Sequence, residues 1–185
     1  FAPVYNISLR VSTQDLHSKG LLLYNRGVYP AALACYRTAA SIDAAFPETN
    51  LNIGAALLKM GQVDSAAAYF EKEIILHPDR AKGYANLAAV ELVQGRFASA
   101  RTLALNSLSL RPYEPSAWVL LLRASANDRA LGIDSLREIT SRATEGAANS
   151  HWVCVEAGAA LERRGDLDAA ATMYLKGIRA SDPPI

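Results

Sequence analysis

The chain has 185 residues, of which 51% are hydrophobic and 20% charged, a composition typical of a folded protein and unlike that of a disordered one. Its formal net charge is +1, and Lys and Arg are scattered among Asp and Glu, so nucleic acid is a poor candidate for the main partner. The longest apolar stretch, Ala117 to Leu122, is far shorter than the about 20 residues of a membrane-spanning helix, so we expect no such segment.

Residues 1–11 are aromatic and β-branched, unlike the rest of the chain, and are expected to form an N-terminal extension. The sequence begins at Phe1 without an initiator methionine, which favours a fragment of a longer protein. A signal peptide, a membrane anchor or a catalytic domain could precede it in that protein.

After this extension the chain repeats itself. Gly27, Gly61 and Gly95 follow one another at equal intervals, and Gly20 and Gly54 keep the same interval. Such a period, about 34 residues, is typical of a stacked array of small helical units. The expected units are residues 13–46, 47–80, 81–114, 115–150 and 151–182.

Each unit has the pattern of two amphipathic helices joined by a short turn. In the second unit Ile53, Leu57 and Met60 follow helical spacing, and Gly61 then interrupts the pattern. We expect this glycine just past the helix end, where a positive φ is favourable for glycine. Helix starts are indicated at Ser12 with Asp15, Pro47, Pro115, and Asn149 or Ser150.

Two glycines lie inside predicted helices, where glycine costs roughly 1 kcal/mol relative to alanine. We expect Gly20 and Gly54 to allow two antiparallel helices to approach closely. Ala32 and Ala66 are expected to be the matching small residues on the second helices.

The recurring residues resemble the pattern of the tetratricopeptide repeat family. They are Gly20, Leu23, Ala32, Tyr36 and Ala39; Ile53, Gly54, Leu57, Ala66, Phe70 and Pro78; Tyr84, Leu87, Ala88, Phe97, Ala100 and Pro112; and Gly158, Leu161, Ala170 and Tyr174. The resemblance implies an all-α fold, a right-handed α-solenoid of about five helix-turn-helix repeats that forms a single domain over residues 12–182.

The fourth unit, 115–150, departs from the pattern. Leu122 stands where the other units have a small residue, and the turn glycine is missing. We therefore expect an irregular repeat whose two helices lie farther apart.

The sequence shows no catalytic constellation, so we expect no enzyme and no cofactor. His17, His77 and His151 fall in different units without a second ligand at metal-binding spacing. Cys35 and Cys154 belong to units too distant in the stack to form a disulfide and are interpreted as small core residues. Unpaired cysteines slightly favour the cytoplasm, while a periplasmic or membrane-tethered location stays open.

In the family the first helix of each repeat faces the concave side, so the resemblance implies that a peptide or helix binds there. The positions concerned are Tyr24, Asn52, Leu58, Lys59, Lys82, Asn86, Leu92, Arg123 and Glu156. The same spacing adds further positions on each first helix, among them Gln14, His17, Glu48, Asn127, Trp152, Glu162 and Arg163.

Asn52 and Asn86 are one repeat apart and resemble the asparagine ladder of sugar-transferase relatives, although asparagine is also a consensus residue there. The carboxylate clamp of chaperone adaptors fits less well. Asn52 and Lys82 match it, but His17, Leu21 and Asn86 do not.

Three functions remain open. The first is a non-catalytic protein-interaction scaffold, and the second is the substrate-selecting arm of a larger enzyme such as a membrane glycosyltransferase. The third is self-assembly through the C-terminal end, because the last predicted helix carries Met173, Leu175 and Ile178 with no polar capping helix behind it.

Overall fold

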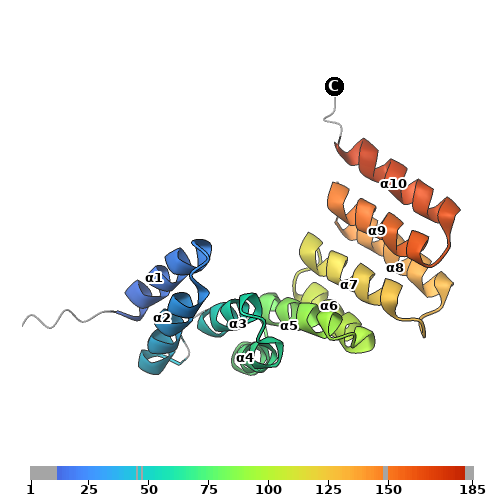
Figure 1. Cartoon of the computed structure of the whole chain (residues 1–185). Helices are drawn as coiled ribbons and strands as arrows, with labels where there is room; N and C mark the ends of the chain where they lie inside the picture. The colour runs from blue at the N-terminus through green and yellow to red at the C-terminus, as the bar shows by residue number, and fades with distance from the viewer. Residues whose placement is uncertain (1–11, 45, 47, 148–149, 182–185) are drawn as a thin grey trace, which may run out of the picture. The chain divides into compact units, whose positions relative to one another are not determined.

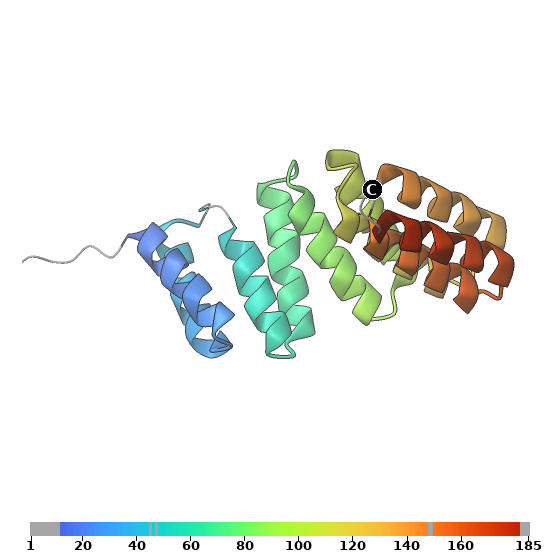
Figure 2. The same ribbon diagram turned by 90° about the horizontal axis from the view of Figure 1, so that it is seen from above.

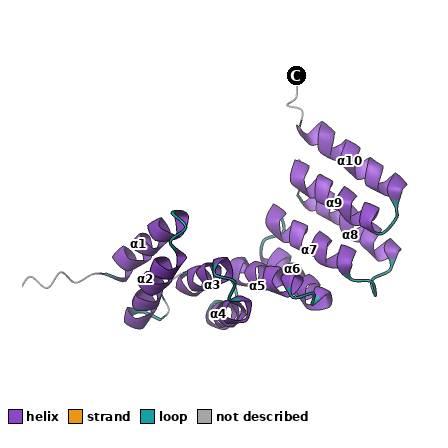
Figure 3. Ribbon diagram, in the orientation of Figure 1, coloured by secondary structure: helices purple, strands orange, loops and turns teal. Residues whose placement is uncertain are grey.

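The computed structural model describes residues 12–44, 46, 48–147 and 150–181, and every regular element in these ranges is an α-helix (Figures 1 and 3). The helices are α1 (Thr13–Asn25), α2 (Tyr29–Ile42), α3 (Thr49–Lys59), α4 (Val63–Leu76), α5 (Ala81–Val93), α6 (Phe97–Leu110), α7 (Pro115–Asn127), α8 (Ile133–Gly146), α9 (His151–Arg163) and α10 (Leu167–Ser181). The all-α repeat fold is thus confirmed. The expected extension 1–11 and the start signals Pro47 and Asn149 lie outside the described residues.

The chain divides into two compact units, Phe1–Leu76 and His77–Ile185, which we call the N-terminal and C-terminal units. In the N-terminal unit α1 packs on α2 and α3 on α4, and α2 and α1 both contact α3. In the C-terminal unit α5 packs on α6 and α9 on α10, and these pairs of neighbours are visible in Figures 1 and 2. A single domain over residues 12–182 stays a prediction.

Local sequence signals explain several helix starts. Ser12 forms a capping box with Asp15: the Ser12 Oγ accepts from the Asp15 amide at 3.1 Å, and the Asp15 carboxylate accepts from the Ser12 amide at 3.1 Å. Hydrogen bonds from Ser12 lower the pKa of the Asp15 carboxyl, and the bond from the Ser12 side chain has a larger effect than the bond from its backbone amide. Pro115 is the first residue of α7, and Ser150 is the N-cap of α9, as predicted.

The turn glycines have the predicted conformation. Gly27, Gly61, Gly95 and Gly165 have φ values of +78°, +75°, +75° and +83°. Each follows the first helix of a pair, and this left-handed conformation is accessible to glycine without the strain that a Cβ would add.

The helix-interior glycines have a different partner from the one predicted. The pairs are Gly20 with Tyr36, Gly54 with Phe70, and Gly158 with Tyr174. A Cβ on Gly54 would lie 2.7 Å from Cζ and 2.9 Å from Cδ1 of Phe70, so an aromatic ring of the second helix occupies the space. Ala32 and Ala66 are buried, but the atoms nearest to the glycines belong to the aromatic rings. The prediction erred because the ring, which lies one turn farther along the second helix, reaches back over the glycine.

The fourth repeat is irregular, as predicted. α7 and α8 contact each other less extensively than the helices of the other pairs, and α8 also packs on α9. The glycine and the aromatic residue exchange helices here: a Cβ on Gly146 of α8 would lie 2.7 Å from Cζ2 of Trp118 on α7. Trp118 is 6% exposed, and its indole N–H donates to the Pro112 carbonyl at 2.8 Å. The bulky Trp118 and Leu122 thus fill the space between α7 and its neighbours, where α7 and α8 contact each other less extensively.

Candidate functional site

In the N-terminal unit, the predicted binding residues lie on α1 and α3. Tyr24 is on α1, while Asn52, Leu58 and Lys59 are on α3. The Asn52 Nδ2 lies 2.7 Å from the His17 Nε2, a contact that links the first helices of two successive repeats. Because an amide nitrogen donates, the imidazole nitrogen is the acceptor, and the Asn52 carbonyl oxygen is not engaged in this bond.

In the C-terminal unit, the predicted residues lie on α5, α7 and α9. Lys82, Asn86 and Leu92 are on α5, Arg123 is on α7 and Glu156 is on α9. The Arg123 Nη2 donates to the Glu156 Oε2 at 2.8 Å, so the structure brings these two predicted residues together. This hydrogen bond raises the pKa of the Arg123 guanidinium. The Arg123 side chain is still 51% exposed.

Two polar contacts therefore connect consecutive first helices, one in each unit. They are His17 with Asn52 between α1 and α3, and Arg123 with Glu156 between α7 and α9. Asn52 belongs to the N-terminal unit and Asn86 to the C-terminal unit, so the ladder expected of them stays a prediction, as does the clamp that combines Asn52 with Lys82.

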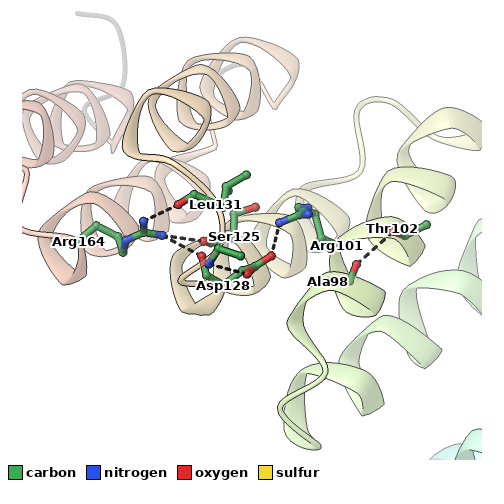
Figure 4. A network of polar contacts seen from close by, with 8 residues as sticks. Ala98, Arg101, Thr102, Ser125, Asp128, Leu131 and Arg164 are labelled. Carbon is green, nitrogen blue, oxygen red and sulfur yellow. Dashed lines mark hydrogen bonds and ion pairs between the residues drawn. The ribbon is translucent and has the colours of Figure 1, made fainter.

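The turn after α7 is held by a long-range arginine in place of the missing glycine (Figure 4). The Arg164 guanidinium donates to the carbonyl oxygens of Leu131 at 2.6 Å, Asp128 at 3.1 Å and Ser125 at 3.4 Å. A cation is favourable at a helix C-terminus, where the carbonyl groups are unsatisfied. On the other side of the turn, Arg101 of α6 donates to the Asp128 carboxylate at 2.5 Å.

A pocket of about 410 Å³ lies at the C-terminal ends of α7 and α9. Its lining consists of Ala126, Asn127, Arg129, Arg163 and Arg164. Sequence reasoning had placed Asn127 and Arg163 on the first-helix side but had missed Arg129 and Arg164. The Arg163-Arg164 doublet before the turn glycine was the available signal, although the carbonyls that Arg164 contacts belong to the preceding repeat.

Three further features of the described residues concern metal ligands, membrane-spanning helices and cysteines. Within them, no group of three or more His, Cys, Asp or Glu side chains is arranged to hold a metal ion. None of the described helices is both long enough and apolar enough to cross a membrane. Cys35 is half-buried and Cys154 buried, both as free thiols, and burial raises the pKa of Cys154.

Comparisons with known proteins bear on this arrangement. The fold is similar to MamA from Desulfovibrio magneticus RS-1, with 21% identity and a TM-score of 0.75 over 92% of this chain and 97% of that one. It is also similar to TTC0263, a thermophilic TPR protein of Thermus thermophilus, with 18% identity and a TM-score of 0.69 over 92% of each chain. YrrB, a TPR protein described as having an unusual peptide-binding site, gives 17% identity and a TM-score of 0.70 over 94% of this chain and 88% of that one.

At these identities the structural likeness shows the fold alone. A search of curated protein sequences finds no match. Family models are more specific: a TPR repeat model matches residues 20–61, and a tetratricopeptide repeat model matches residues 51–115. Together the two matches span residues 20–115, more than half of the sequence, and the chain belongs to the tetratricopeptide repeat family.

Proposed function

We propose that this chain is a non-catalytic protein-interaction scaffold that binds a peptide segment or helix along the first helices of its repeats. We call this surface the first-helix face. It comprises Tyr24, Asn52, Leu58, Lys59, Lys82, Asn86, Leu92, Arg123 and Glu156. The family resemblance implies that these helices line a concave groove, and YrrB offers a precedent for peptide binding within the same fold.

The observation that carries this proposal is the exposed ion pair of Arg123 and Glu156. It spans two consecutive first helices at 2.8 Å, and the arginine remains half exposed. A solvent-exposed ion pair contributes at most about 1 kcal/mol to stability, so the fold does not require it. A guanidinium has five N–H donors, and a partner's backbone carbonyls can use those that Glu156 leaves.

The remaining residues of the face support recognition of a polypeptide. Asn86 and Asn52 can each donate to and accept from a peptide backbone without regard to its side chains. Leu58 and Leu92 are half-buried and offer apolar contact on the same helices as Asn52 and Asn86, respectively. Polar positions next to leucines at helical spacing suit an extended peptide or an amphipathic helix.

The test is a random-peptide display selection on the immobilised protein, followed by calorimetric titration of the selected peptides. We expect Asn52→Ala combined with Asn86→Ala, and separately Arg123→Ala, to weaken peptide binding about tenfold while the helical circular dichroism stays unchanged. Thr102→Ala, at an exposed position of the second helix α6, is the matched control and should bind like the wild type. Unchanged affinity in both first-helix variants would refute the proposed surface.

Self-assembly is a second candidate, favoured by the exposed apolar residues of α10. Ile178 is 58% exposed, whereas its counterpart Leu108 on α6 is 6% exposed against the following helix. The two residues are equivalent because they lie equally far after the turn glycines Gly165 and Gly95. If a second copy covers α10, light scattering should show concentration-dependent association that Ile178→Glu abolishes, and a strict monomer would eliminate this candidate. The enzyme-arm alternative is decided by the sequence of the full-length gene.

A further inference from the structure

The pocket at the ends of α7 and α9 carries an excess of positive charge. Arg129, Arg163 and Arg164 all line it, and no carboxylate of the described residues does. Among these residues, Arg129 and Arg163 form no ion pair, and both side chains are exposed. Arg164 likewise forms none, so none of the three arginines around this hollow is in an ion pair with a carboxylate of the described residues.

The nearby carboxylates are already engaged elsewhere. Asp128 accepts from Arg101 at 2.5 Å, and Asp166 accepts from Arg137 at 2.6 Å. Glu162, on the same helix as Arg163, accepts from the Tyr174 hydroxyl at 2.6 Å. Each of these three carboxylates would have to give up its present contact before it could pair with an arginine of the pocket.

One wall of the pocket is held in place. Arg164 is fixed by hydrogen bonds to three backbone carbonyls of the α7–α8 turn (Figure 4). The Asn127 Nδ2 donates to the Arg123 carbonyl at 2.7 Å. Because Arg164 also satisfies the C-terminal carbonyls of α7, it offsets the negative end of that helix dipole, which would otherwise repel an anion. At the end of α9, the carbonyls of Leu161 and Glu162 accept from the backbone amides of Asp166 and Gly165, so they too have hydrogen-bond partners.

The pocket adjoins the proposed binding surface. Asn127 lies one turn after Arg123 on α7, and Arg163 lies two turns after Glu156 on α9. A segment that contacts the Arg123–Glu156 pair and continues along these helices would reach the pocket.

We propose that Arg129, Arg163 and Arg164 form an anion-binding site for the carboxylates of an acidic segment in the bound partner. This inference rests on the proposed function, since it assigns a chemical class to the polypeptide that the first-helix face binds. Arginine suits the role because its planar fork can donate two parallel hydrogen bonds to one carboxylate. The volume of about 410 Å³ accommodates one or two acidic side chains with bound water.

The experiment uses the intact chain and two fluorescently labelled probes, an octaglutamate peptide and an octaglutamine peptide of the same length. Binding is followed by fluorescence anisotropy at low and at high salt, and inorganic pyrophosphate is added as a competitor. The test variant is Arg129→Glu combined with Arg163→Glu. Arg142→Glu combined with Arg179→Glu is the matched control, since it reverses the charge of two other exposed arginines outside the pocket. Circular dichroism checks that all variants are folded.

We expect octaglutamate to bind and octaglutamine not to bind. The double reversal should weaken octaglutamate binding by roughly tenfold or more, because it replaces two attractive charge contacts by repulsive ones. The double control, Arg142→Glu with Arg179→Glu, should change it less than threefold, and added salt should weaken binding to the wild type. Binding that is absent, or equal in the double reversal and the wild type, would overturn the site. If pyrophosphate binds through these arginines and octaglutamate does not, the assignment to an acidic peptide is overturned.

The peptides from the display selection separate this inference from the proposed function. If they bind through Asn52 and Arg123 but are insensitive to the double reversal, the function stands and the anion site is wrong. If octaglutamate binds as expected but no display-selected peptide depends on the first-helix face, the proposed function fails and the basic pocket remains as an isolated anion site.

Discussion

Substituting Gly54 by alanine tests whether aromatic rings hold the paired helices together. In an exposed helix this change stabilises by about 1 kcal/mol through helix propensity. Here the new methyl group would lie 2.7 Å from Cζ and 2.9 Å from Cδ1 of Phe70, well inside van der Waals contact. The Phe70 ring is 1% exposed and cannot swing into solvent, so either the ring or the helix must shift.

Overpacking of this kind costs about 1–3 kcal/mol. With three ring carbons in conflict we take the upper end, and after subtracting the gain in propensity we expect Gly54→Ala to lower the free energy of unfolding by about 1–2 kcal/mol. Urea denaturation followed by far-ultraviolet circular dichroism measures this. The companion variant Phe70→Leu removes the ring but keeps an apolar side chain.

The double variant, Gly54→Ala with Phe70→Leu, separates the steric clash between the two side chains from the effect of each substitution alone. We expect Gly54→Ala to cost less in the Phe70→Leu background, with a coupling energy of about 1 kcal/mol. The third repeat supports this reasoning, because at the equivalent positions the glycine is replaced by Ala88 and the ring by Ala104, both fully buried. Stabilisation by Gly54→Ala, or additive effects in the double variant, would refute the role of the ring.

Three further outcomes follow from buried polar groups. Arg164→Ala should lower the free energy of unfolding by about 2–3 kcal/mol in urea denaturation, since three carbonyls lose a charged donor. Arg164→Lys should recover part of this loss, and an Arg164→Ala variant as stable as the wild type would contradict the assigned turn contact. Burial, more than the neighbouring Tyr24 and Cys35, raises the pKa of Tyr36 from 10.0 to about 12, so the folded state retains a proton that the unfolded state loses, and stability should fall as the pH rises from 10 to 12. Tyr36→Phe should remove this alkaline loss of stability. At pH 7 it should change the free energy of unfolding by less than about 1 kcal/mol, because the hydroxyl has no hydrogen-bond partner among the described residues. An alkaline stability profile like that of the wild type, measured by urea titrations, would contradict this. The hydrogen bond from Arg96 lowers the pKa of Glu91 below 4.5, so this contact stabilises above pH 4.5 and is lost on acidification. Because Arg96 is half exposed, Arg96→Ala should lower the free energy of unfolding by at most about 1 kcal/mol at pH 7. Between pH 7 and pH 3 the variant should lose less of this free energy than the wild type, and parallel acid profiles of the two proteins would show that the pair does not act in this way.

Features set by local chemistry could be predicted from the sequence. The repeat period located the helix pairs, and each turn glycine has the positive φ that its position after a helix implied. The capping box of Ser12 and Asp15 was readable in the same way, because both partners lie within one turn. Such signals depend on the backbone of a few consecutive residues, so the sequence carries them directly.

Features that depend on distant partners were harder to predict. The space over Gly54 was assigned to Ala66, but the side-chain length of Phe70 decides what fills it. The irregular fourth repeat was recognised by its missing glycine, yet the replacement, Arg164, comes from the following repeat. The pocket of arginines follows from that long-range contact, so sequence spacing alone could not place Arg129 beside Arg164.

The measurement that tests the central claim most directly is photo-crosslinking of a display-selected peptide. A benzophenone amino acid is placed at Leu58 or Leu92 on the first helices, and at Ala68 or Thr102 on the second helices as controls. Mass spectrometry then identifies the crosslinked product. The account predicts peptide adducts from Leu58 and Leu92 and none from the two control positions. Adducts only from Ala68 and Thr102 would contradict it, because the partner would then bind the opposite helix of each repeat.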